Sequence, residues 1–258
     1  GTALDSRSID MLVVLRSVKS AYSRVRHMGT AIKVELHSHT RDDPDDAIRH
    51  SALELVDRAL ALGFGALAIT LHDRYFGDPD VIACARGRGL TLIPAVELTI
   101  EGRHILLVHF PAAAGQVVGF DGLRRLKQDH PAGLVIAPHP WFPLGRSLGE
   151  RLMEQHATLW DAVEINGFYT RTLDFNRRAW QWARRRGLPL VGNCDVHQLD
   201  QLGTTFSMVD VEGDATADAV CAAIRGGRVR VESRPLSHVR AAQIAARALV
   251  AKFLSRPQ

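Results

Sequence analysis

The residues of this chain with the clearest chemical potential are two histidines, His37 and His39, at the end of the alternating stretch 33–36. Side chains two positions apart in a strand point to the same face, so the two imidazoles would project together beyond the strand end. Two converging imidazoles can hold one borderline metal ion such as zinc. A surface strand with two solvated histidines fits the pair alone equally well, so the rest of the chain must decide.

The same arrangement recurs along the chain. Apolar runs at 66–70, 90–96, 133–137 and 162–166, and later at 188–191, alternate with helical stretches. Alternating strands and helices predict a parallel sheet, and this many units favours a (β/α) barrel. In such barrels the chemistry lies at the carboxyl ends of the strands. That side also receives His72, Glu97, His139, Glu164, Asp195 and His197, and only His104 begins a run instead of ending one.

Length and composition set the frame. The 258 residues are 46% hydrophobic, which suits one globular domain, and no apolar run reaches the length of a membrane span. Three cysteines without metal-type spacing favour a reducing cytoplasm, and the net charge of +4 is mild. We expect residues 1–32 to be a helical extension, with an amphipathic helix over 8–27, and residues 33–258 to be the barrel with a C-terminal helix. Ser51 and Glu54 have the spacing of a helix capping box.

Five motifs in order resemble the PHP (polymerase and histidinol phosphatase) superfamily. They are the stretches 35–40 (ELHSHT), 68–73 (AITLHD), 93–97 (IPAVE) with 104–106 (HIL), 137–140 (APHP) and 192–197 (GNCDVH). The resemblance spans about residues 34–210. It implies an α/β fold, a distorted seven-stranded (β/α) barrel of the PHP type, whose C-terminal mouth holds up to three metal ions.

The resemblance also implies the ligands of two or three divalent ions, of zinc, manganese or iron. The first ion would take His37, His39, Glu97 and Asp195. Glu97 would bridge to a second ion, shared with His104 and His139. A bridging carboxylate is reasonable because two dications about 3.5–4 Å apart need shared negative charge. A third ion would take His72, His197 and a ligand from the loop after the first motif.

The sequence departs from the family pattern in two places. Leu71 stands where the family usually carries an aspartate, which removes a carboxylate that could orient His72. In the loop, spacing favours Asp45 as the ligand, while Asp43 and Asp46 are also within reach. The loop ligand therefore stays open among three aspartates.

These residues predict a metal-dependent hydrolase, most simply a phosphoesterase that uses a metal-bridged hydroxide at the barrel mouth. We expect Arg171, with Arg74 as a second candidate, to stabilise the phosphate charge, and Asp73 or a histidine such as His197 to protonate the leaving group. The expected substrate is a small phosphorylated molecule. No membrane is expected as a partner, and nucleic acid is expected only as a substrate.

Several alternatives remain. The same centre could cleave an amide or a lactone, and a domain of this type could be a non-catalytic accessory. Asp73 could instead cap a loop, Arg171 could be an ordinary surface arginine, and Glu164 could be a simple strand-end carboxylate. His109 could replace His104 as a ligand. The other histidines are expected to be solvated; they are His27, His50, His130, His156 and His238.

Overall fold

The computed structural model describes residues 29–143 and 146–254, and the predicted helix over 8–27 lies outside them. The first sheet has five strands in the order β10-β9-β1-β2-β3. Strands β1, β2 and β3 run parallel, and β9 runs antiparallel to both β1 and β10. The bounds are β1 (Thr30–Glu35), β2 (Phe64–Ala68), β3 (Thr91–Ile93), β9 (Thr205–Val211) and β10 (Val229–Ser233).

The second sheet also has five strands, in the order β4-β5-β6-β7-β8. Strand β5 pairs antiparallel with β4 and β6, and β6, β7 and β8 run parallel. The bounds are β4 (Ala95–Ile100), β5 (Arg103–Val108), β6 (Leu134–Ala137), β7 (Ala162–Asn166) and β8 (Leu190–Asn193). Strand β1 begins at Thr30, three residues before the expected start of the barrel domain.

The predicted α/β class is confirmed, but the closed seven-stranded barrel is not observed, because the described strands form two separate mixed sheets. Pro94 stands between β3 and β4 and has no N–H with which to continue a ladder. At the other boundary, Gly192 of β8 donates its N–H to the Ser207 hydroxyl of β9 and not to a backbone carbonyl. The sheets therefore meet along two seams instead of closing into one.

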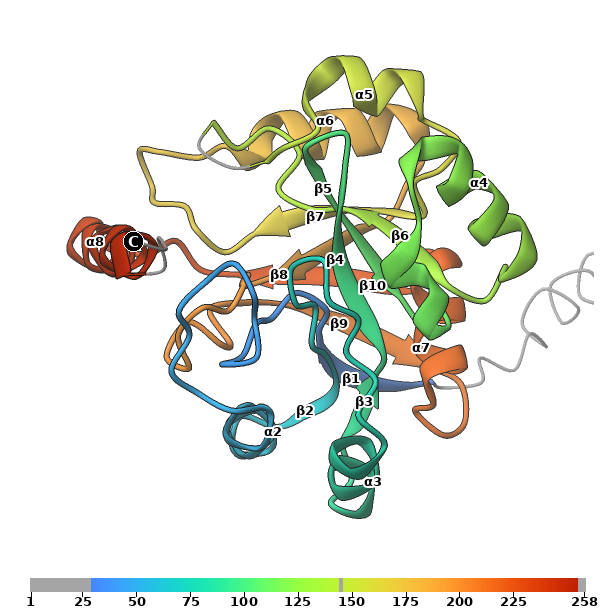
Figure 1. Ribbon diagram of the computed structural model, residues 1–258, viewed down its shortest axis with the longest axis horizontal. Coiled ribbons are helices and arrows are strands. Elements are labelled where there is room, and N and C mark those ends of the chain that lie inside the picture. Colours follow the sequence, from blue (N-terminus) through green and yellow to red (C-terminus); the bar gives the residue numbers. More distant parts are fainter. Residues whose placement is uncertain (1–28, 144–145, 255–258) are drawn as a thin grey trace, which may run out of the picture.

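Helices cover the outer faces of both sheets (Figure 1). Helices α4, α5 and α6 lie beside the second sheet, and α2 and α3 beside the first. Ser51 and Glu54 form the predicted capping box of α2. The helices are α2 (Ala52–Ala61), α3 (Pro79–Gly87), α4 (Gly119–Asp129), α5 (Gly149–Gln155), α6 (Asn176–Arg186), α7 (Ala217–Arg225) and α8 (His238–Leu254), with a 3-10 turn η1 (Ala112–Gln116).

The space between the two sheets is filled by small and branched side chains, including Val34, Ala68, Leu106 and Ile136. Two further clusters lie outside the sheets, one around the buried Trp182 of α6 and one beneath α2 and α3. Apolar packing on both faces explains why the strands read as nearly continuous hydrophobic runs. No helix among the described residues is long and apolar enough to cross a membrane.

Candidate metal centre

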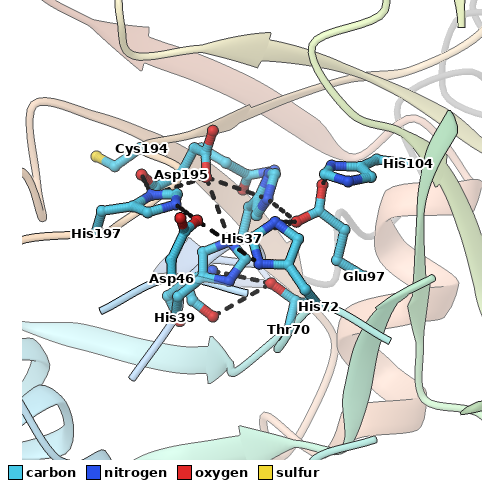
Figure 2. Close-up of polar contacts among 12 residues, drawn as sticks. His37, His39, Asp46, Thr70, His72, Glu97, His104, Cys194, Asp195 and His197 are labelled. Atoms are coloured by element: carbon cyan, nitrogen blue, oxygen red, sulfur yellow. Dashed lines mark hydrogen bonds and ion pairs between the residues drawn. The ribbon is translucent and has the colours of Figure 1, made fainter. Parts of the chain in front are cut away.

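The histidines and carboxylates singled out by their position converge where the two sheets meet (Figure 2). His37 and His39 follow β1, and His72 follows β2 in the same sheet. The second sheet contributes Glu97 from β4, His104 from β5 and His139 after β6, and the chain beyond β8 adds Asp195 and His197. The backbone holds these ends together, since Ser38 bridges to Val196 and His72 to Glu97.

The buried carboxylate of Glu97 is the hub of the cluster. Its Oε1 lies 2.7 Å from His104 Nδ1 and 3.3 Å from His139 Nε2. Its Oε2 lies 3.2 Å from the Nε2 atoms of two histidines and 3.4 Å from that of a third, namely His37, His72 and His39. A carboxylate offers about four lone-pair positions, so five imidazoles exceed what hydrogen bonding alone can use.

The spacing of these atoms fits a divalent metal ion. Asp195 Oδ1 lies 3.3 Å from His37 Nε2 and 3.4 Å from His39 Nε2. Metal–ligand bonds of about 2.1 Å in a tetrahedron place neighbouring ligand atoms about 3.4 Å apart. The Nε2 of His39 is buried and has no hydrogen-bond partner among the described residues, so its lone pair is available. Imidazoles with a few carboxylates suit zinc, manganese or iron.

Two carboxylates contact the Nδ1 atoms of His37 and His39 and so fix the orientation of these rings. Glu164 Oε2 lies 2.8 Å from His37 Nδ1, and Asp43 Oδ2 lies 2.8 Å from His39 Nδ1. A proton held on Nδ1 leaves the Nε2 lone pair facing the cluster. Glu164 is fully buried and also accepts from Asn193. These contacts favour the view that Glu164 supports a metal site over a simple strand-end carboxylate.

The loop after β1 brings two of its three candidate aspartates to the cluster. Asp46 Oδ2 lies 3.1 Å from His197 Nε2, and Asp43 lies 3.0 Å from His72 Nδ1. The structure does not bring Asp45, the residue favoured by spacing, to these histidines. Asp43 accepts the N–H groups of both following aspartates, and the resulting turn directs the Asp45 carboxylate toward Arg146 instead.

Asp43 supplies the carboxylate contact to His72 that Leu71 cannot provide. The side chain of Leu71 is buried, and the carboxylate that contacts His72 comes from the loop instead of from the preceding residue. Asp43 thus contacts two candidate ligands, His39 and His72, at once. The sequence could not show this, because the contact joins the loop to the end of β2.

Burial and opposite charge compete over the pKa values of the cluster. Burial alone would raise the pKa of the Glu97 carboxyl, but His37 and His104 hold it well below its usual range. Burial opposes a charged His72, yet its pKa rises to about 9 because of Asp43. In His104, burial outweighs Glu97 and the pKa falls. Without metal, protonated imidazoles such as His72 therefore stabilise the buried, ionised carboxylates of the cluster.

Two candidate ligands have a left-handed backbone. The φ of His139 is 29° and that of Asp195 is 53°. Residues other than glycine seldom adopt this conformation, and it concentrates at functional sites. The surrounding contacts must hold both residues there. The His139 ring contacts Glu97, and the Asp195 carboxylate points into the cluster (Figure 2).

Comparisons with known proteins agree with this fold. Residues 174–229 match a family model described as PHP-associated, and a search of curated proteins found no match. The structure resembles a two-domain protein from Bacteroides vulgatus that contains a predicted PHP-like metal-dependent phosphoesterase, with 17% identity, a TM-score of 0.63, and coverage of 85% of this chain and 70% of that one. The chain therefore shares its fold with this PHP-like protein, and residues 174–229 share a PHP-associated segment.

Two further structures share the fold. PsfC from Pseudomonas syringae is 14% identical with a TM-score of 0.61, covering 88% of this chain and all (100%) of its own. A lesion-specific endonuclease from Pyrococcus furiosus is 14% identical with a TM-score of 0.55, covering 84% of this chain and 66% of its own. Identities this low establish the fold and leave the reaction to be argued from the site.

Three residues considered for other roles lie outside the cluster. Asp73 is exposed and its carboxylate accepts the N–H of Thr99, which favours the loop-cap alternative. Arg171 is exposed on the loop between β7 and α6, and its role as a phosphate clamp stays a prediction. His109 pairs with Asp218 of α7 at 2.9 Å, so His104 is the histidine of this strand in the cluster.

The sequence did not reveal two residues that support the cluster. Glu35 is fully buried and accepts the N–H groups of His37 and Cys194, which ties the ends of β1 and β8 together. Burial raises the pKa of its carboxyl to about 8. His50 was expected to be solvated, but it is buried and its Nε2 lies 2.8 Å from the carbonyl oxygen of His39. Likewise His156 is buried and stacks on Phe120.

Proposed function

We propose that this protein is a metal-dependent hydrolase of the PHP type that cleaves phosphoesters. The observation that carries the proposal is Glu97, a buried carboxylate with imidazoles from both sheets around it. A site that only stabilised the fold would not need so many buried titratable groups in one place, because each costs desolvation free energy. Similar structures named as a PHP-like metal-dependent phosphoesterase and a lesion-specific endonuclease support phosphoester chemistry.

The residues that would hold two ions form two groups sharing Glu97. His37, His39 and Asp195 form one group, and His104 and His139 the other, with Glu97 common to both. His72, His197 and a loop aspartate, Asp46 in place of Asp45, would hold a third ion. When bound, such ions supply Lewis acidity, lower the pKa of coordinated water and neutralise charge on a phosphoryl group.

Residues of the chain itself would position the substrate and move protons. Glu164 and Asp43 keep protons on Nδ1 of His37 and His39, so that these rings cannot turn away. His197 is the candidate proton donor when it holds no ion. Without metal, burial lowers its pKa, but Asp195 and Asp46 raise it to about 9. A proton donor of this kind would serve the leaving alkoxide.

We place the catalytic unit in residues 33–258 and the substrate among small phosphorylated molecules. The decisive experiment is metal analysis of the purified protein together with a hydrolysis screen of phosphomonoesters, diesters, triesters, carboxylic esters, lactones and amides. We expect bound divalent metal, activity on a phosphoester class, and loss of that activity on chelation with recovery on adding metal. Preference for lactones or amides would overturn the phosphoesterase proposal in favour of the carbonyl hydrolase. No activity on any class would favour an accessory domain.

A further inference from the structure

We propose that Arg146 binds the phosphate group of the substrate and that Asp45 holds its guanidinium in the absence of substrate. This inference rests on the proposed phosphoesterase function. It assigns Arg146 and Asp45 roles in substrate binding that the sequence did not predict.

The main chain fixes Arg146 beside the second group of candidate ligands. The carbonyl oxygen of Arg146 accepts the N–H of His104 at 2.8 Å. The next residue, Ser147, is buried and donates its hydroxyl to the carbonyl oxygen of His139 at 2.7 Å. Arg146 is therefore held between two histidines that contact Glu97, and it cannot drift from the site without breaking these bonds.

The guanidinium lies on the face of β4 that carries Glu97. Its Nη1 donates to Thr99 Oγ1 at 3.2 Å. Thr99 is two positions after Glu97 in the same strand, so both side chains project from the same face, about 7 Å apart along the strand. Thr99 is also directly opposite His104 in the β4–β5 ladder. A phosphate group bound beside Glu97 would thus be within reach of this guanidinium.

The partner of Arg146 comes from the opposite sheet. Arg146 Nη1 lies 3.3 Å from Asp45 Oδ2, on the loop after β1 that also carries Asp43 and Asp46. The pair consequently spans the seam above the histidines, from the second sheet to the loop of the first. Arg146 and Asp45 are 49% and 41% exposed, and exposed ion pairs contribute only about 0–1 kcal/mol. Such a pair can open readily.

A phosphate group is a better partner for this arginine than Asp45. The planar guanidinium can donate two parallel hydrogen bonds to phosphate oxygens, while only one contact to Asp45 is made here. Arg74, the other candidate for binding phosphate, instead donates from its Nη1 to the carbonyl oxygen of Asp42. Asp45 would therefore act as a competitor that substrate phosphate displaces.

The test is the affinity of the metal-loaded full chain for inorganic phosphate, measured by calorimetry, with KM for the best phosphoester measured alongside. We expect Arg146→Ala to weaken phosphate binding about 10- to 100-fold, since a charge-assisted contact is lost. Asp45→Asn should act in the opposite direction and tighten phosphate binding several-fold. Arg103→Ala is the matched control, because Arg103 is exposed and adjacent to His104 but projects from the other face of β5.

The outcomes separate this inference from the proposed function. Wild-type protein that loads metal but neither binds phosphate nor cleaves any phosphoester refutes the proposed function itself. Wild-type activity with unchanged phosphate affinity in Arg146→Ala, at equal metal content, overturns the role of Arg146 alone. If Arg146→Ala fails to fold, Asp45→Asn decides, and unchanged or weaker phosphate binding in that variant overturns the inference.

Discussion

Glu164 offers a sharp test of how the buried carboxylates support the metal ligands. Both of its oxygens are fully engaged. Oε2 receives His37 Nδ1 at 2.8 Å and Asn193 Nδ2 at 3.0 Å, while Oε1 receives the N–H of His139 at 3.2 Å and Asn166 Nδ2 at 3.0 Å. The four lone-pair positions of a carboxylate are therefore all used by donors.

The isosteric change Glu164→Gln cannot satisfy these donors. With the amide oxygen toward His37, the new NH₂ group faces the donors of His139 and Asn166. Asn166 cannot turn over to compensate, because its Oδ1 already accepts the N–H of Phe168. With the amide reversed, the NH₂ group faces His37 Nδ1 and favours the proton on Nε2, which removes the lone pair from the metal side.

Either arrangement loses at least one charge-assisted hydrogen bond, worth about 1.5–3 kcal/mol, which corresponds to roughly 10- to 100-fold weaker metal binding. The assay is titration of chelator-stripped protein with zinc or manganese against a competing chromophoric chelator. Glu150→Gln, which changes an exposed carboxylate on α5, is the matched control. Equal metal affinity in Glu164→Gln and wild type would refute the reasoning.

Two further predictions concern the cluster as a whole. Glu97→Gln should remove more bound metal per chain than His139→Gln, because both candidate ion groups share Glu97, and elemental analysis of the two variants checks the order. With chelator present, the pKa values of about 9 for His72 and His197 predict pH-dependent stability. Imidazoles raised above 6.5 stabilise the fold fully below pH 6.5, and this contribution is lost as pH rises through 9. Metal binds neutral imidazole, so the difference in Tm between metal-loaded and chelated protein should widen from pH 6.5 to 9. A difference that narrows over this range would contradict the assignment.

The sequence predicted which side of the sheet carries the chemistry because strand ends can be read from local patterns. Eight of the nine predicted metal ligands lie in the converging cluster, and Asp45 alone does not. Spacing along a loop could not distinguish it from Asp46, because the turn is set by hydrogen bonds to Asp43 that no periodicity reveals. The supporting role of Glu35 was missed for another reason. A glutamate at an alternating position of a strand usually faces solvent, and nothing in the sequence indicates that this one is buried.

The architecture was predicted less completely than the site. A run of apolar residues at 90–96 reads as one strand, yet it contains both β3 and the start of β4, in different sheets. Pro94 separates them, and the positive φ values of Glu101 and Gly102 then turn β5 back antiparallel to β4. Which strand pairs with which depends on contacts distant in sequence, and this is where pattern-based prediction of a barrel was wrong.

The seam between the sheets has a consequence for the integrity of the molecule. Residues before Pro94 supply His37, His39 and His72, whereas Glu97, His104 and His139 come after it. The group of His37, His39, Glu97 and Asp195 therefore takes ligands from both portions of the chain, so an ion bound there would join the end of β1 in the first sheet to β4 in the second. A chain cut near Pro94 could still reassociate through the β1–β9 ladder, and metal bound at this group would then strengthen the association and report that both portions are correctly docked.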